Sequence, residues 1–187
     1  NTHLCRQGNR FNRAKLLISC YSATLRLQLT LADRPGAARL GRRALRFCER
    51  LDLTLIEIDT SFRLTRNLMR VLAINVLEAW ASADVALYWQ ARQALQAVHD
   101  HAHRPEHDDR EVQEDHRGFA VQVMERVALI DPALTDVATM RRALEGLMLL
   151  LFREEILSEA WQAERLPGLL PCFEGFLKPH PATSSSP

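Results

Sequence analysis

The sequence predicts an all-α protein of about six or seven helices, stacked as antiparallel hairpins. Three observations support this prediction. Apolar residues make up 47% of the 187 residues, which is enough to build a core. They recur every three or four positions between residues 11 and 161, which is the period of an α-helix. Most links between the periodic segments are short, and a short link makes consecutive helices run antiparallel.

The stretch 61–100 shows the pattern most clearly. Apolar residues lie on two sides of its first half, which is typical of a helix packed between neighbours. Asp59 or Thr60 is expected to cap the start of this helix, and Asp84 the start of the next one. The absence of Gly and Pro between residues 61 and 100 leaves one long continuous helix as an alternative.

The front third allows two interpretations. Residues 24–31 (TLRLQLTL) and 51–58 (LDLTLIEI) alternate like strands, and a helix is expected between them over 35–49, with Asp33 and Pro35 at its start. A strand–helix–strand unit is therefore possible. We predict a helix over 9–32 instead, because leucine is a better helix former than strand former and no further strands exist to complete a sheet.

The domain organisation follows from these segments. We expect a loosely ordered segment over 1–8, a single helical-repeat domain over 9–177 and a disordered tail over 178–187. The His-rich, charged stretch 101–118 is predicted to be the main loop. Asp131 and Pro132 are predicted to start a long helix over 134–163. A short helix is expected over 169–177, after the stop at Pro167.

The composition limits which partners and which cellular compartment we expect for this protein. Twenty-four basic residues balance 23 acidic ones, so we expect no direct binding to nucleic acid. No apolar run is long enough to cross a membrane. The four cysteines are widely spread, which favours a reducing intracellular compartment, nucleus or cytoplasm, with Cys20 and Cys48 in the core. Because the sequence begins at Asn1 rather than Met, we expect it to be a fragment of a longer protein.

The sequence indicates no enzyme. No nucleophile has its activating partners nearby, and we expect no cofactor. Five of the seven histidines fall within 99–116, so a metal site is an alternative, with candidate ligands His101, His103 and His107.

The expected partners are other proteins. Aromatic and arginine side chains dominate protein contacts, and a helix over 35–49 would carry a basic stripe. The stripe consists of Arg39, Arg42, Arg43 and Arg46. The predicted partner-binding residues are Trp89, Arg63, Arg66 and Arg70.

Residues 35–51 resemble the second helix of a tetratricopeptide repeat, with small and apolar residues at Ala37, Gly41, Ala44 and Leu45. Within that class, 66–80, 93–103 and 119–131 resemble meiosis-specific tetratricopeptide scaffolds of crossover formation and the synaptonemal complex. The resemblance implies a right-handed superhelix and a nuclear, chromosome-associated, non-enzymatic role.

The predicted function is therefore a protein–protein interaction scaffold. A second hypothesis comes from the segment 134–163, which resembles the ligand-sensing, dimer-forming half of TetR-like regulators. Such a domain would hold an apolar ligand between its helices.

Overall fold

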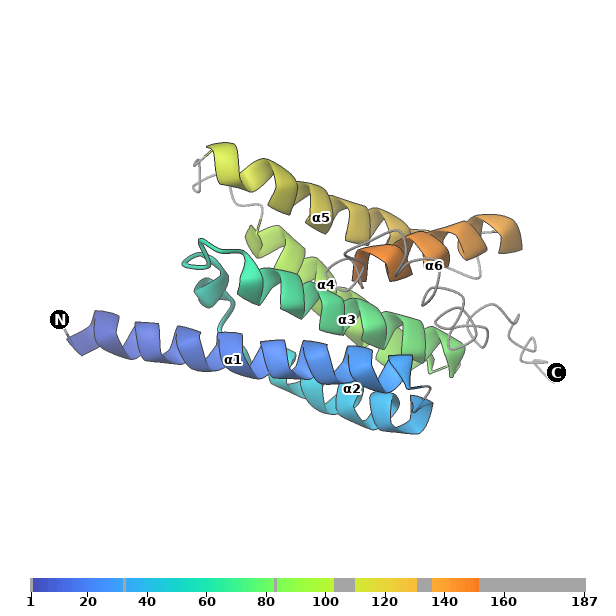
Figure 1. Ribbon diagram of the computed structural model, residues 1–187, viewed down its shortest axis with the longest axis horizontal. Helices are drawn as coiled ribbons and strands as arrows, with labels where there is room; N and C mark the ends of the chain where they lie inside the picture. The colour runs from blue at the N-terminus through green and yellow to red at the C-terminus, as the bar shows by residue number, and fades with distance from the viewer. Residues whose placement is uncertain (1, 32, 83, 103–109, 131–135, 152–187) are drawn as a thin grey trace.

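The fold comes from a computed structural model, which describes residues 2–31, 33–82, 84–102, 110–130 and 136–151 (Figure 1). Within these residues the chain forms six α-helices and one 3₁₀ helix, and it contains no strand. The all-α prediction is confirmed. The elements in chain order are α1 (Thr2–Thr30), α2 (Arg34–Glu49), η1 (Leu53–Ile56), α3 (Arg63–Ala81), α4 (Val85–Ala102), α5 (Arg110–Ala128) and α6 (Val137–Leu151).

Consecutive helices pack together as pairs, and the pairs lie side by side in chain order (Figure 1). Helix α3 lies at the centre and packs against α1, α2, α4 and α5. Helix α1 packs against α2 and α3 and forms one edge of the assembly, while α6 packs against α5 near the opposite edge. Among the described helices, none is long and apolar enough to cross a membrane.

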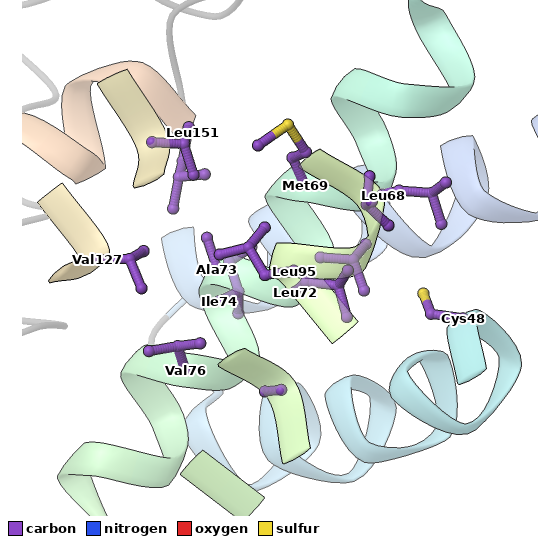
Figure 2. Close-up of a cluster of buried hydrophobic side chains, with 14 of the residues drawn as sticks. Cys48, Leu68, Met69, Leu72, Ala73, Ile74, Val76, Leu95, Val127 and Leu151 are labelled. Atoms are coloured by element: carbon purple, nitrogen blue, oxygen red, sulfur yellow. The ribbon is translucent and has the colours of Figure 1, made fainter. Parts of the chain in front are cut away.

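The central helix explains why the core forms where it does. Both apolar stripes of α3 are buried, as the sequence predicted, because the helix has neighbours on two sides. Figure 2 shows Leu68 and Leu72 of α3 close to Leu95 of α4 within this core. Fully buried α3 residues form most of the core's centre: Leu64, Leu68, Met69, Val71, Leu72, Ala73, Val76 and Leu77.

Two of the predicted helix starts are confirmed. The carboxylate of Asp33 accepts a hydrogen bond from the Gly36 backbone N–H at 3.0 Å, with Pro35 in the first turn of α2. The carboxylate of Asp84 accepts from the Leu87 backbone N–H at 3.0 Å at the start of α4. These side chains satisfy backbone donors that the first turn leaves without partners. The break at Asp84 also rules out one continuous helix over 61–100.

Helix α3 begins with a more elaborate cap. Phe62, just before the helix, has a φ of 54°, which few residues other than glycine adopt. The chain turns back there, so that Asp59 reaches the third helical residue. Its Oδ2 accepts hydrogen bonds from the Thr65 backbone N–H at 2.9 Å and from the Thr65 hydroxyl at 3.0 Å. The predicted capping role of Asp59 is confirmed.

Replacing Asp59 by alanine should lower the free energy of unfolding by about 2 kcal/mol. The change removes the cap and leaves two buried donors of Thr65 without their acceptor. Asp59→Asn keeps an acceptor oxygen, so its free energy of unfolding should fall by less than that of Asp59→Ala. Urea denaturation followed by circular dichroism measures both. Equal losses for the two variants would show that the acceptor oxygen is not what stabilises this turn.

Several predicted boundaries differ from the structure. Helix α1 begins at Thr2, so it includes most of the segment 1–8 that was expected to be loose. Once a helix has formed, each further residue adds a hydrogen bond at little cost. The strand–helix–strand alternative is wrong, because residues 24–30 belong to α1 and residues 53–56 form η1.

The predicted loop 101–118 is also too long. Helix α4 continues to Ala102, and α5 begins at Arg110. The charged residues of 110–118 are compatible with a helix, and the buried Phe119 and Val123 anchor that helix to the core. The predictions for 103–109, for the helix start at Asp131 and Pro132, and for the chain beyond residue 151 lie outside the described residues. The described part of α6 begins after Asp136, whose carboxylate accepts from the Thr139 backbone N–H at 3.0 Å.

The two described free cysteines have opposite environments. Cys48 is buried in the core, and this burial raises the pKa of its thiol to about 12. It is therefore protonated and unreactive at neutral pH. Cys20 is exposed on α1, so the expectation of a core role for it is wrong. The sequence could not separate the two, because both have apolar neighbours in the chain.

Candidate functional site

The three predicted arginines of α3 become less exposed to solvent along the helix. Arg63 is exposed, Arg66 is half-buried and Arg70 is only 1% exposed. The guanidinium carbons of Arg66 and Arg70 lie 5.4 and 5.8 Å from the centre of the Phe119 ring on α5. Cations at this distance are attracted to an aromatic face. Arg70 is therefore an internal residue that packs α5 onto α3, and the expectation that it forms part of a partner-binding surface is corrected.

Trp89 of α4 is half exposed, and its neighbours hold its ring in place. The ring meets Tyr88 edge to face, with 5.3 Å between the ring centres, and the Arg92 guanidinium lies 5.4 Å from its centre. Tyr88 is itself fixed: its hydroxyl donates to the Ile130 carbonyl at 3.1 Å and accepts from Arg92 Nη1 at 2.8 Å. A rigid aromatic side chain loses little conformational entropy when a partner covers it.

The structure does not bring Trp89 together with the α3 arginines. Helices α3 and α4 form a tight antiparallel hairpin, so residues near their two starts lie at opposite ends of it. Arg63 and Arg66 are near the start of α3, whereas Trp89 is near the start of α4. The four predicted binding residues therefore do not form one site.

A second group of exposed arginines belongs to α2, the helix that packs beside α4. Arg39, Arg43, Arg46 and Arg50 are all exposed and follow the spacing of one helix face. Within the described part of the chain, no ion pair involves these four side chains. The opposite face of α2 packs into the core through Ala37, Gly41, Ala44, Leu45 and Cys48.

Two side-chain contacts join α2 to α4. Arg42 Nη2 lies 3.5 Å from Asp84 Oδ2, and the Gln90 side chain donates a hydrogen bond to Glu49. The second contact lies seven residues further along α2 than the first, and six residues further along α4. The two helices therefore run in roughly the same direction. Trp89 is the residue before Gln90, but consecutive residues of a helix point about 100° apart, and the Trp89 ring lies against Tyr88 and Arg92 of its own helix rather than against α2.

We call this surface the α2–α4 face, and it consists of Arg39, Arg43, Arg46, Arg50, Trp89 and Gln93. Its guanidinium groups offer several donors in a fixed planar arrangement that matches carboxylate groups. The sequence showed the arginine spacing of α2, but Arg42 turns out to contact Asp84 rather than solvent alone. The packing of α2 against α4 shows that the helix with the arginine row and the helix with the exposed Trp89 are neighbours.

The described part of the chain contains no site of the kind that the metal hypothesis requires. His101 Nδ1 lies 3.0 Å from the Ala97 carbonyl, and His99 Nδ1 lies 3.3 Å from Asp100 Oδ1. No group of three side chains capable of holding a metal is present among the described residues. His103 and His107 lie outside them.

A small pocket lies between α2 and α3, beside Gly41, Asn75 and Glu78. It has room for about one water molecule, far less than an apolar ligand of the kind that TetR-like sensors bind would need. Burial raises the pKa of the Glu78 carboxyl, while Arg34, 3.7 Å away, acts in the opposite direction. Gly41 permits the close approach here, since a side chain at that position would contact the Asn75 amide. These features are explained by helix packing.

Comparison with known proteins identifies no relative: no family model matches the chain, and neither a curated protein nor a solved structure matches it.

Proposed function

We propose that this chain is a non-enzymatic scaffold that binds another protein, and that its α2–α4 face holds an acidic segment of that partner. The observation that supports this most directly is the combination of a half-exposed, braced Trp89 with a row of exposed arginines on the adjacent helix. Trp and Arg are the residue types that contribute most to protein contacts. The resemblance to meiotic scaffolds supports a nuclear, chromosome-associated partner.

The charges favour an acidic partner. The four arginines of the row span twelve residues, from Arg39 in α2 to its C-cap residue Arg50, or about 16 Å. Along this length they can meet several carboxylates of one extended or helical segment. Of the nearby acidic groups, Asp84 is already paired with Arg42, and Glu49 keeps its charge beside the neutral Gln90, so the four arginines still leave the row with a net positive charge.

A protein segment fits this surface better than a nucleic acid. The chain as a whole carries a net charge of only +1, whereas binding to a phosphate backbone requires a basic excess. Trp89 adds an exposed apolar side chain on the neighbouring helix α4. A partner with one apolar side chain among its acidic residues would contact both parts.

The test uses a fluorescein-labelled peptide rich in glutamate with one central leucine, and a second peptide with glutamine in place of glutamate. Fluorescence anisotropy should detect binding of the first peptide only. Arg43→Glu should weaken that binding about 10-fold, because it puts a negative charge in the row. Trp89→Ala should weaken it by a similar or larger factor.

Arg142→Glu on α6 is the matched control and should leave the affinity unchanged, because Arg142 is exposed but lies away from the α2–α4 face. Equal binding of the two peptides, or an equal loss for Arg43→Glu and Arg142→Glu, would refute the proposal. A labelled single-stranded oligonucleotide of the same net charge serves as a competitor. If it binds more tightly than the peptide, the face recognises nucleic acid instead.

A further inference from the structure

Helix α1 has a second apolar face that no described element covers. Its core side is formed by Ala14, Ile18, Leu25 and Leu29, which pack against α2 and α3. On the opposite side the exposed fractions of Leu16, Leu27 and Leu31 are 66%, 57% and 69%. We call the row of exposed residues on that side the α1 seam: Leu16, Cys20, Ala23, Thr24, Leu27 and Leu31.

This seam lies at the edge of the stack (Figure 1). The end element of a stacked helical array normally presents a polar outer face, because its apolar side has no further neighbour to cover it. Exposed apolar surface of this extent is typical of an interaction site. Its spacing of three and four residues is that of the contact line between two paired helices.

The seam is complementary to itself. When two copies of α1 run antiparallel about a point between Ala23 and Thr24, Leu16 meets Leu31 of the second copy. In the same register, Cys20 meets Leu27 of the second copy. Ala23 and Thr24 lie at the centre, where small side chains let the helices approach closely. A two-fold interface requires this reciprocal matching.

The charges select the same orientation. The exposed residues Arg6, Arg10 and Arg13 precede the seam on α1. In a parallel pair each would lie opposite its own copy, and like charges would repel. In the antiparallel pair Arg13 instead approaches the turn of the second copy that contains Arg34 and the exposed Asp33, and the Arg34 guanidinium is already paired with Glu78 of its own chain at 3.7 Å. The apolar pattern fits a two-fold pair, and the charges favour its antiparallel form.

We propose that the α1 seam is a homodimer interface in which two copies of α1 pair antiparallel about a two-fold axis between Ala23 and Thr24. The paired segment, residues 16–31, is about 23 Å long. This surface is separate from the α2–α4 face, so each copy in the dimer keeps its face for an acidic partner.

Sedimentation velocity of the full chain tests the association. The wild-type protein should show a concentration-dependent exchange between monomer and dimer. Leu27→Lys should weaken the dimer by about 100-fold, because each dimer loses two buried leucines. Leu129→Lys is the matched control, since Leu129 is an exposed leucine away from α1, and it should dimerise like wild type. A chain that stays monomeric, or a dimer unaffected by Leu27→Lys, would overturn the proposal.

Disulfide trapping tests the orientation. In the antiparallel pair, Ala23 lies close to Ala23 of the second copy, while the two Cys20 residues are about 10 Å apart along the axis, too far for a disulfide. The variant Cys20→Ser/Ala23→Cys should form a dimer linked through residue 23, as mass spectrometry can verify. Cys20→Ser/Asn12→Cys should form no link through residue 12. A wild-type dimer linked through Cys20 would mean that the helices pair in parallel, and would contradict the proposed geometry.

Discussion

Replacing Leu72 by alanine is expected to lower the free energy of unfolding by about 3 kcal/mol. Leu72 is completely buried and lies at the middle of α3, the helix that packs against four others. Figure 2 shows it close to Leu68 and Leu95. The loss has two parts: the apolar surface that is no longer buried, and the cavity that remains. Because neighbours surround α3, little collapse can fill that cavity.

Urea denaturation followed by circular dichroism measures this loss, with an unchanged slope showing that the same transition is compared. Leu129→Ala is the matched control, because Leu129 is 42% exposed, and it should change the stability by less than about 0.5 kcal/mol. If Leu72→Ala and Leu129→Ala lower the free energy of unfolding by the same small amount, α3 is not the centre of a close-packed core.

Arg70→Ala should also cost about 3 kcal/mol of unfolding free energy, an unusual effect for an arginine. The whole side chain is buried, its guanidinium lies beside the Phe119 ring, and Nη1 donates to Asn67 Oδ1 at 3.4 Å. Alanine removes the buried hydrocarbon stem as well as the charge. The contact between α3 and α5 should therefore weaken directly.

Two other substitutions separate the contributions to this effect. Arg70→Met keeps most of the stem volume without the charge, so it should lose less than Arg70→Ala. Arg63→Ala removes an exposed arginine of the same helix and should have almost no effect on stability. If Arg70→Ala were as stable as wild type and lost only binding to a partner, Arg70 would belong to a contact surface after all. The same denaturation measurement, combined with the peptide titration, decides between these outcomes.

The helices and several of their starts could be predicted from the sequence because their causes are local. Asp33, Asp59 and Asp84 act on backbone donors a few residues away, so their spacing to the helix start was sufficient. The two apolar stripes of α3 likewise predicted a helix buried on two sides. The segment 24–31 shows the limit of local patterns, since its alternation is equally compatible with a strand. Its place in α1 depends on Leu25 and Leu29 packing into the core.

The candidate sites were harder to predict because their causes are distant in the chain. The sequence alone placed Arg70 on a surface, whereas in the structure α5 covers it. Trp89 was correctly singled out as accessible, but α2, which packs beside its helix, comes from residues about forty to fifty positions earlier. The α1 seam was not predicted, because the alternation over 24–31 does not show which side of a helix its neighbours cover.

The amino-acid order by itself determined an all-helical chain, its capped helix starts and a central helix with two apolar sides, because these follow from contacts within one or two turns. The tertiary structure alone decided which arginines are buried, that the helix carrying Trp89 packs beside the arginine-bearing helix α2, and that no described element covers the second apolar face of α1. The physical reason is that burial belongs to a residue's neighbours in space, and those neighbours are set by how the helices pack rather than by the sequence around the residue.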